Sequence, residues 1–266
     1  MIRFVAADMD GTLLDSQKRL PEEFESVVHA LKAQDVRFII ASGRQAATLR
    51  RDLGELAQEM ILFAENGTVV MEGNERLFVS PMEKSDVRRV LEKTHGLEGM
   101  HAVLCRPDAA MIEESAPEVF RRNVKMYYES TQIVPDLLAV CDEFDDVCKI
   151  AFYDEGDAEH HEYPVLKEWF EDTLSVILSG YSWVDLMQPG INKGSAMRRL
   201  QEMKGVLPEE CMAFGDYLND KEMLEAVGES YAMENGLDEI KAVCKYIAPS
   251  NDDNGVMRVI KERFSL

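Results

Sequence analysis

The chain has 266 residues, of which 46% are hydrophobic and 30% are charged. This composition is ordinary for a globular protein of one large or two modest domains, and it argues against global disorder. Its 29 Lys and Arg residues are outnumbered by 50 Asp and Glu residues, so the formal net charge is -21. Nucleic acids and anionic membranes both bind clustered positive charge, so we expect neither as a partner.

We expect neither a signal peptide nor a membrane-spanning segment. No basic stretch followed by an apolar run begins the chain, and no apolar segment reaches the roughly 20 residues that a membrane span needs. The five cysteines form no CxxC pair, and Cys211 and Cys244 lie among apolar neighbours, which predicts buried thiols rather than ligands or disulfides. We therefore expect a cytoplasmic protein, either a monomer or a homodimer.

Short apolar runs alternate with helical patterns in the first third of the chain. The runs cover residues 2–7, 36–41 and 60–64, and helical spacing covers 21–33 and 45–56. Strands that are apolar throughout and separated by helices indicate a parallel sheet covered on both faces.

A β-hairpin is predicted next, at 68–71 and 76–79, because Gly73-Asn74 lies between these segments. The final third repeats the earlier alternation of helices and strands. Its expected helices are 192–204, 220–226, 237–243 and 255–263, and its expected strands are 211–214, 231–233 and 246–248.

The middle of the chain differs, because its strands are more polar and of mixed length. Strands are expected at 101–105, 148–153, 175–178 and 183–187, and helices at 83–93, 117–127 and 159–171. This pattern indicates an α+β insertion between two halves of one sheet. The predicted fold is α/β: a Rossmann-like parallel-sheet core with helices on both faces, formed by residues 1–80 and 190–266, plus an inserted α+β cap domain at 81–189.

The segment Asp8-Met9-Asp10-Gly11-Thr12 directly follows the first apolar run. Residues two apart on extended chain point the same way, so both carboxylates face one site at the edge of the sheet where ligands bind. One carboxylate can then act as nucleophile and metal ligand, and the other as general acid and base. A simple turn is the alternative, since Asp and Gly favour turns.

Ser42 ends the second apolar run, and Gly43 and Arg44 precede the following helix. A hydroxyl and backbone N–H groups at the start of a helix form an anion site. On their own these three residues are more typical of a loop, and Arg44 would either contact the substrate or pair with a surface acid.

The segment Asp8-Met9-Asp10-Gly11-Thr12-Leu13-Leu14 resembles the first motif of the haloacid dehalogenase superfamily, in particular its Cof-like phosphatases with a large cap. The resemblance implies that Ser42 is the second-motif hydroxyl that hydrogen-bonds the transferring phosphoryl group, with Gly43 and Arg44 as its usual neighbours. Lys193, which follows Asn192 where the chain returns to the core, is similar to the lysine of the third motif.

Residues 215–220, Gly-Asp-Tyr-Leu-Asn-Asp, resemble the fourth motif. The resemblance implies that Asp216 binds a metal and that Asn219 lies beside the phosphate, although Asn219 is also suited to cap a helix. Asp220 would orient Lys193 or a metal-bound water. Tyr217 departs from the family, which more often has a small or polar residue there.

Two further pairs of residues have competing interpretations. Asn66-Gly67 after the third apolar run also resembles a Cof-like feature near the rim of the site, but a plain turn is favoured. His160-His161 suggests a metal site, but adjacent histidines on a helix point in different directions, so we expect a solvated helix face.

A phosphate ester, Asp8 and Asp216 in one site would repel one another, so the chemistry needs a compensating cation. Mg²⁺ is expected because it prefers oxygen ligands: the carboxylates of Asp8 and Asp216 and, by the resemblance, the main-chain carbonyl of Asp10. Lys193 would add positive charge, and Ser42 and Asn219 would hold phosphate oxygens.

The predicted function is Mg²⁺-dependent hydrolysis of a small phosphorylated metabolite through an aspartyl-phosphate at Asp8. The resemblance favours sugar phosphates, with nucleotides and phosphorylated vitamins as the alternatives, and it implies that the cap contributes to substrate specificity. A phosphomutase or phosphotransferase shares the same intermediate and stays open. A non-catalytic protein that binds a phosphorylated metabolite is disfavoured, because a binder needs neither a nucleophile nor a proton shuttle.

Overall fold

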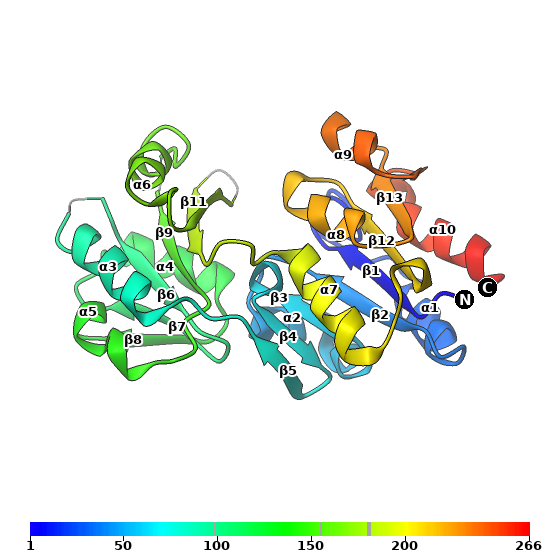
Figure 1. The fold of residues 1–266 in the computed structure, drawn as a ribbon, viewed down its shortest axis with the longest axis horizontal. Coiled ribbons are helices and arrows are strands. Elements are labelled where there is room, and N and C mark those ends of the chain that lie inside the picture. Colours follow the sequence, from blue (N-terminus) through cyan, green and yellow to red (C-terminus); the bar gives the residue numbers. More distant parts are fainter. Residues whose placement is uncertain (98, 155, 180–181) are drawn as a thin grey trace. The chain divides into compact units, whose positions relative to one another are not determined.

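The computed structural model describes residues 1–97, 99–154, 156–179 and 182–266. Contacts divide the chain into two compact units, shown in Figure 1. We call the first the core unit; it consists of Met1–Ser42, Leu53–Leu77 and Asn192–Leu266. The second, the insertion unit, consists of Gly43–Asp52 and Phe78–Ile191. The boundaries inferred from the sequence, which place 43–52 with the core, stay a prediction.

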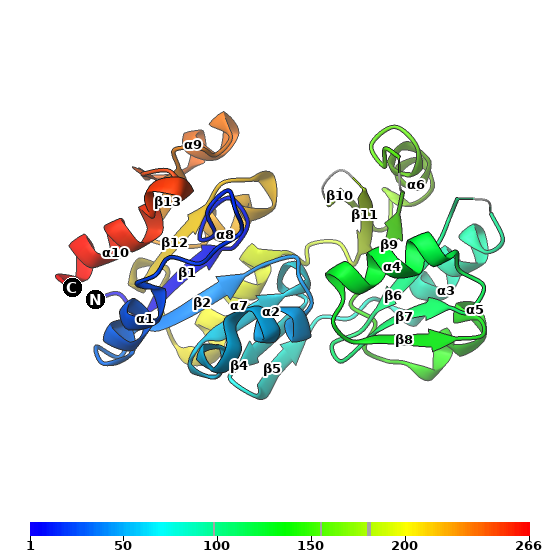
Figure 2. The same ribbon diagram turned by 180° about the vertical axis from the view of Figure 1, so that it is seen from behind.

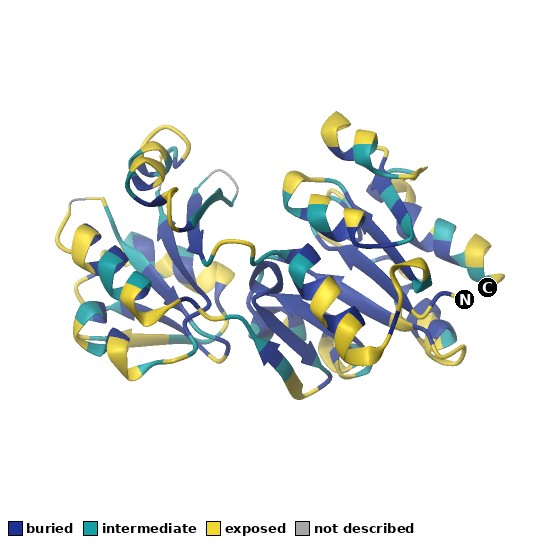
Figure 3. Cartoon of the chain, in the orientation of Figure 1, coloured by how far each residue is buried: buried dark blue, intermediate teal, exposed yellow. Residues whose placement is uncertain are grey.

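An eight-stranded sheet runs through the core unit in the order β14-β13-β12-β1-β2-β3-β4-β5. Its strands are β1 (Phe4–Asp8), β2 (Arg37–Ala41), β3 (Ile61–Ala64), β4 (Val69–Glu72), β5 (Glu75–Val79), β12 (Cys211–Gly215), β13 (Glu229–Met233) and β14 (Tyr246–Ala248). The strands from β14 to β3 pair in parallel, and β4 pairs antiparallel to β3. The central strands are buried along their length, as Figure 3 shows, because helices cover both faces.

The helices of the core unit are α1 (Phe24–Lys32), α7 (Lys193–Lys204), α8 (Lys221–Glu225), α9 (Asp238–Val243) and α10 (Gly255–Phe264). Helices α7 and α8 lie over one face of the sheet, and α1 and α10 over the other (Figures 1 and 2). Helix α1 buries Phe24, Val27, Val28 and Leu31, which share one face of the helix because of their spacing.

The insertion unit contains a six-stranded sheet in the order β10-β11-β9-β6-β7-β8, antiparallel except for the β7–β8 pair. Its strands are β6 (Ala102–Cys105), β7 (Ala110–Glu113), β8 (Thr131–Val134), β9 (Lys149–Tyr153), β10 (Ser175–Leu178) and β11 (Trp183–Met187). Its helices are α2 (Ala46–Leu53), whose last residue belongs to the core unit, α3 (Lys84–Thr94), α4 (Glu118–Tyr127), α5 (Leu137–Val140) and α6 (Glu162–Phe170). One apolar cluster includes residues of α3 and α6, and a second includes residues of α4.

These observations confirm the predicted α/β fold with an inserted α+β segment. Strands β7 and β8 and helix α5 were not predicted from the sequence. Strand β8 (Thr131–Val134) is partly exposed at the edge of its sheet, so its residues show neither a continuous apolar run nor a clean alternation. Helix α5 has only four residues, which is too short to show a helical period.

All five cysteines are free thiols. Cys211 is buried, as predicted, whereas Cys244 is only partly buried. Among the described residues, no helix combines the length and the apolar character that crossing a membrane requires.

Candidate active site

The site lies where the central strands of the core sheet end. Asp8 is the last residue of β1 and pairs in register with Ala41 of β2, while Ala7 pairs with Phe214 of β12. Ser42 and Asp216 therefore follow the ends of the two strands that flank β1. The chain runs from β1 to β2 on one side, and β12 pairs on the other, which creates the kind of switch point where open α/β sheets bind ligands.

The loop after β1 holds the carboxylate of Asp216. Gly11 has a φ of 86°, and a Cβ atom at this position would collide with the Asp216 carboxylate, so only glycine allows this close approach. The hydroxyl of Thr12, which is buried, donates a hydrogen bond to Oδ1 of Asp216 at 2.7 Å. The sequence analysis assigned no role to Thr12, because its partner lies 204 positions away.

Lys193 is the first residue of α7, and its side chain is completely buried. Asn192 caps the helix by accepting a hydrogen bond from the backbone N–H of Ser195 at 2.8 Å. The ammonium nitrogen of Lys193 donates to Oδ1 of Asp8 at 2.5 Å and to Oδ1 of Asp220 at 2.6 Å. Burial opposes the charge, but the pairs with Asp220 and Asp8 outweigh it and raise the pKa of Lys193. The lysine therefore stays protonated between the two carboxylates.

Asp220 links this lysine to the loop after β12. Its second oxygen, Oδ2, accepts hydrogen bonds from the backbone N–H groups of Asp216 at 3.1 Å and Tyr217 at 3.2 Å. Both carboxylate oxygens of Asp220 are thus engaged by the protein, which leaves Asp8 and Asp216 better suited to bind a cation.

Three carboxylates converge in this site. Ligand atoms of Asp8, Asp216 and Asp220 all lie within 4.8 Å of one another. Burial, with the neighbouring carboxylates, raises the pKa of Asp8 to about 8 despite the opposing charge of Lys193, and burial raises the pKa of Asp216 to about 6. One ammonium group cannot neutralise three carboxylates, so the full ionisation of this cluster needs a further cation. Hard divalent cations prefer such oxygen ligands, so the residues present fit one.

Asp10 lies in a more open environment than Asp8. Its Oδ1 accepts a hydrogen bond from the ammonium group of Lys18 at 2.7 Å, and 40% of the Asp10 side chain is exposed. The side chain of Asp10 is not among the described acidic groups that cluster within ligand distance, and its predicted metal contact was through the main-chain carbonyl. The pairing of Asp10 with Lys18 was not predicted from the sequence.

The remaining predicted residues are distributed over both units. Ser42 is buried, and its backbone N–H bonds the carbonyl of Phe63 at 2.8 Å. Asn219 follows β12 in a short 3-10 helix of the core unit, Leu218–Asp220. Gly43 and Arg44 belong to the insertion unit, where Arg44 pairs with Asp52 at 2.8 Å.

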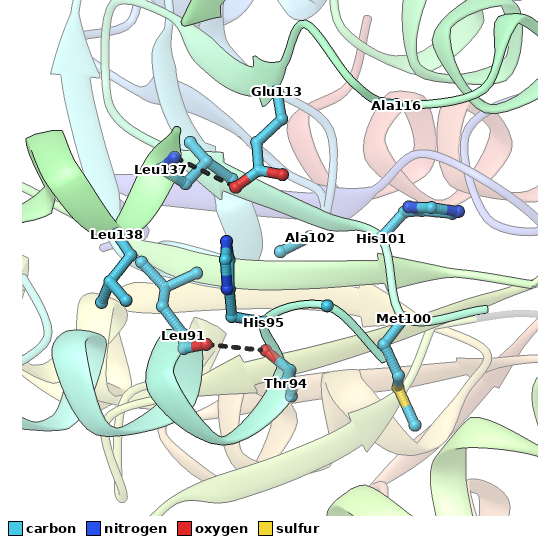
Figure 4. A pocket seen from close by; sticks show the side chains of 11 residues that line it. Leu91, Thr94, His95, Met100, His101, Ala102, Glu113, Ala116, Leu137 and Leu138 are labelled. Carbon is cyan, nitrogen blue, oxygen red and sulfur yellow. Dashed lines mark hydrogen bonds between the residues drawn. The ribbon is translucent and has the colours of Figure 1, made fainter. Parts of the chain in front are cut away.

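A separate pocket in the insertion unit contains none of the predicted site residues. Figure 4 shows that Glu113 faces this pocket while it accepts a hydrogen bond from the backbone N–H of Leu137 at 3.1 Å. The pocket is lined by Leu91, Thr94, His95, Gly96, Met100, His101, Ala102, Glu113, Ala116, Leu137 and Leu138.

Two other groups of described residues could hold a metal, namely His95 with Glu113 and Asp136, and Asp154 with His161 and Glu162. Backbone N–H groups already occupy carboxylates in both groups. We assign neither group as a metal site.

His160 and His161 are both exposed, as expected. They precede α6 instead of lying on it, so the prediction that they belong to a helix was wrong. Each ring pairs with a nearby acid: His160 Nδ1 lies 2.8 Å from Asp157, and His161 Nδ1 lies 2.7 Å from Asp154. The helix begins only at Glu162.

Comparisons with known proteins show the family to which the chain belongs. Residues 5–260 match the family of haloacid dehalogenase-like hydrolases. The 5-amino-6-(5-phospho-D-ribitylamino)uracil phosphatase YbjI of Escherichia coli is 32% identical over 264 residues, which cover 97% of this chain and 95% of that protein. An HMP-PP phosphatase of Klebsiella pneumoniae is 26% identical over 254 residues, covering 95% of this chain and 91% of that protein.

Solved structures show the same fold. A protein from Eubacterium rectale has a TM-score of 0.87 at 26% identity, with 98% of this chain and 99% of that chain covered. A protein from Thermotoga maritima has a TM-score of 0.85 at 23% identity, with 98% and 97% covered, and this likeness concerns the fold alone.

The chain therefore belongs to the haloacid dehalogenase-like hydrolases. Within that superfamily it is a phosphatase of the Cof-like type.

Proposed function

We propose that this phosphatase hydrolyses a small phosphorylated metabolite through an aspartyl-phosphate at Asp8, with Mg²⁺ as its metal. The observation that supports it most is the buried Asp8 carboxylate, which contacts Lys193 and lies within ligand distance of Asp216. We further propose a sugar or sugar-alcohol phosphate as the preferred substrate class. The phosphoribityl group in the name of the Escherichia coli relative supports that preference.

The carboxylates of Asp8 and Asp216 and the main-chain carbonyl of Asp10 would hold the cation. Bound Mg²⁺ supplies positive charge that offsets the repulsion between the carboxylates and the phosphate dianion. Lys193 supplies a second positive charge to Asp8 from a fixed position. Ser42 and Asn219 are the proposed donors to the phosphate oxygens, and Arg44 is a proposed further contact.

In the first half-reaction an oxygen of Asp8 attacks phosphorus, and the bond between phosphorus and the leaving oxygen breaks. Asp10 gives its proton to that oxygen, which departs as an alcohol. In the second half-reaction Asp10, now ionised, takes a proton from water as the water oxygen attacks phosphorus. The bond to Asp8 then breaks and phosphate is released. Asp10 serves in both steps because the first step leaves its carboxyl ionised, and the second step needs an ionised carboxylate as the base.

The first prediction is that the purified protein releases inorganic phosphate from an aryl phosphate and from sugar phosphates without any acceptor. Chelation of divalent cations should abolish release, and added Mg²⁺ should restore it, because the acidic cluster needs a cation to admit a phosphate dianion. Phosphate release is measured against substrate across a panel of phosphorylated metabolites. Transfer that occurs only when an acceptor is present would instead establish a mutase or transferase, and binding without turnover would establish a sensor.

The second prediction concerns pH. In the metal-free protein the pKa of Asp8 is about 8 and that of Asp216 is about 6, so both carboxyls gain protons as the pH falls. A cation binds the ionised forms, so Mg²⁺ affinity should fall as the pH is lowered from 8 to 5, by up to about tenfold per pH unit for each proton displaced. Calorimetry in two buffers of different ionisation enthalpy measures the protons released. An affinity that does not change with pH would contradict the proposed ligands.

A further inference from the structure

The turn between β3 and β4 has an unusual backbone. Glu65, Asn66 and Gly67 have successive φ values of 49°, 56° and 92°, all in the left-handed region. Residues other than glycine adopt this region at a cost, and such conformations cluster at functional sites. Glu65 and Asn66 are also buried, which is not typical of an ordinary surface turn.

This turn contacts three segments that carry proposed site residues. The backbone N–H of Asn66 donates to the carbonyl oxygen of Ser42 at 2.9 Å. The side-chain oxygen of Asn66 accepts a hydrogen bond from Nδ2 of Asn219 at 3.2 Å. A Cβ atom at Gly67 would lie 2.8 Å from the carbonyl oxygen of Asn192, so the turn packs directly against the start of α7, next to Lys193.

We propose that Asn66 is a positioning residue that orients Asn219 toward the phosphate. This inference rests on the proposed function, in which Asn219 binds a phosphate oxygen. The nitrogen of a carboxamide carries two hydrogens in one plane, so a bond from one of them to Asn66 sets the direction of the other. The left-handed turn brings the side-chain oxygen of Asn66 to Asn219, which lies 153 positions away in the sequence. A turn that only connects two strands would not need this contact.

The variant that separates side chain from backbone is Asn66→Gly. Glycine adopts a φ of 56° without strain, so the turn is kept while the carboxamide is lost. Asn254→Gly is the matched control, because Asn254 is another asparagine of the core unit with a φ of 55°, and its side chain does not cap α10. Asn219→Ala and the double variant complete a thermodynamic cycle.

We expect Asn66→Gly to weaken the binding of inorganic phosphate in the presence of Mg²⁺ and to lower kcat/KM, each by about 3- to 10-fold, as for the loss of one hydrogen bond. In the Asn219→Ala background the same change should have no further effect, because the two residues act as one unit. The Tm of Asn66→Gly should match that of the Asn254→Gly control, which should bind phosphate as the wild type does. Calorimetry, steady-state kinetics and thermal unfolding measure the three quantities.

Losses that add independently in the double variant, or an Asn66→Gly protein that binds phosphate normally, would overturn the inference. A loss of phosphate binding in Asn66→Gly that is accompanied by a lowered Tm would assign Asn66 a structural role only and would overturn the inference. If the wild type binds phosphate but hydrolyses no ester, hydrolysis is refuted, and the binding cycle still decides the role of Asn66. If the wild type hydrolyses esters but binds no measurable phosphate, the double-variant cycle in kcat/KM decides the role of Asn66, and an unchanged kcat/KM in Asn66→Gly overturns the inference.

Discussion

Asp8→Asn is expected to abolish turnover while the protein stays folded. The amide has nearly the shape of the carboxylate, but it is a poor nucleophile and cannot supply the charge that binds Lys193 and a cation. Loss of a catalytic nucleophile typically costs more than about 10⁴-fold in kcat. Phosphate release measures the loss, and thermal unfolding checks the fold.

The matched control for this variant is Asp15→Asn. Asp15 belongs to the same loop after β1, but its carboxylate pairs with Arg19 outside the acidic cluster. We expect this control to keep most of the wild-type activity. Appreciable turnover by Asp8→Asn, at a rate comparable with that of the control, would exclude an aspartyl-phosphate at Asp8.

Lys193→Met is expected to have the largest effect on stability. It leaves Asp8 and Asp220 buried without the ammonium group that lies within 2.6 Å of both. Removing one partner from a buried ionic cluster costs about 3–5 kcal/mol. The loss of positive charge beside the proposed nucleophile, Asp8, should also lower kcat by at least about 10²-fold.

The pH dependence of this destabilisation follows from the raised pKa of Lys193. A base whose pKa is raised on folding stabilises the folded state at every pH below its unfolded value, so the contribution of Lys193 is present throughout the neutral range. The pKa of Asp8 is about 8 before the substitution, so its carboxyl accepts a proton readily as the pH falls. The difference in the free energy of unfolding between variant and wild type should therefore narrow as the pH falls through about 8, as measured by urea unfolding at several pH values.

Lys204→Met is the control for this variant. Lys204 ends the same helix, but it pairs with Glu72 at the surface, at 2.6 Å, with 36% of its side chain exposed. Exposed ion pairs contribute about 0–1 kcal/mol, so this variant should unfold almost as the wild type does. Equal stability of the two methionine variants would contradict the expected contribution of the buried Lys193 pairs to the free energy of unfolding.

The parallel core was predictable because its strands have an unambiguous pattern. Strands β1, β2 and β3 are short, almost entirely buried and apolar, and helices separate them. The insertion was less predictable. Its edge strand β8 has half-exposed residues, so its sequence lacks the apolar pattern of a buried strand. Its pairing with β7 depends on backbone hydrogen bonds, which any residue type can make.

The sequence by itself determined which residues we propose for the chemistry. Asp8 and Asp10 are two positions apart at the end of a strand, and this spacing, together with the later motifs, required no knowledge of long-range contacts. It also determined the formal net charge of -21. Both are local properties, since they depend on residue type and on separation along the chain.

Only the tertiary structure decided how those residues are held. Thr12 contacts Asp216 across 204 positions, and Asn66 contacts Asn219 across 153, and neither partner follows from residue type or spacing. The complete burial of the Lys193 side chain does not follow from the sequence either. The raised pKa values of Asp8 and Lys193 depend on burial and on their contact, so they too come from the tertiary structure. Burial and partner choice depend on which segments the sheet order brings together, because desolvation and hydrogen bonding act through space and not along the chain.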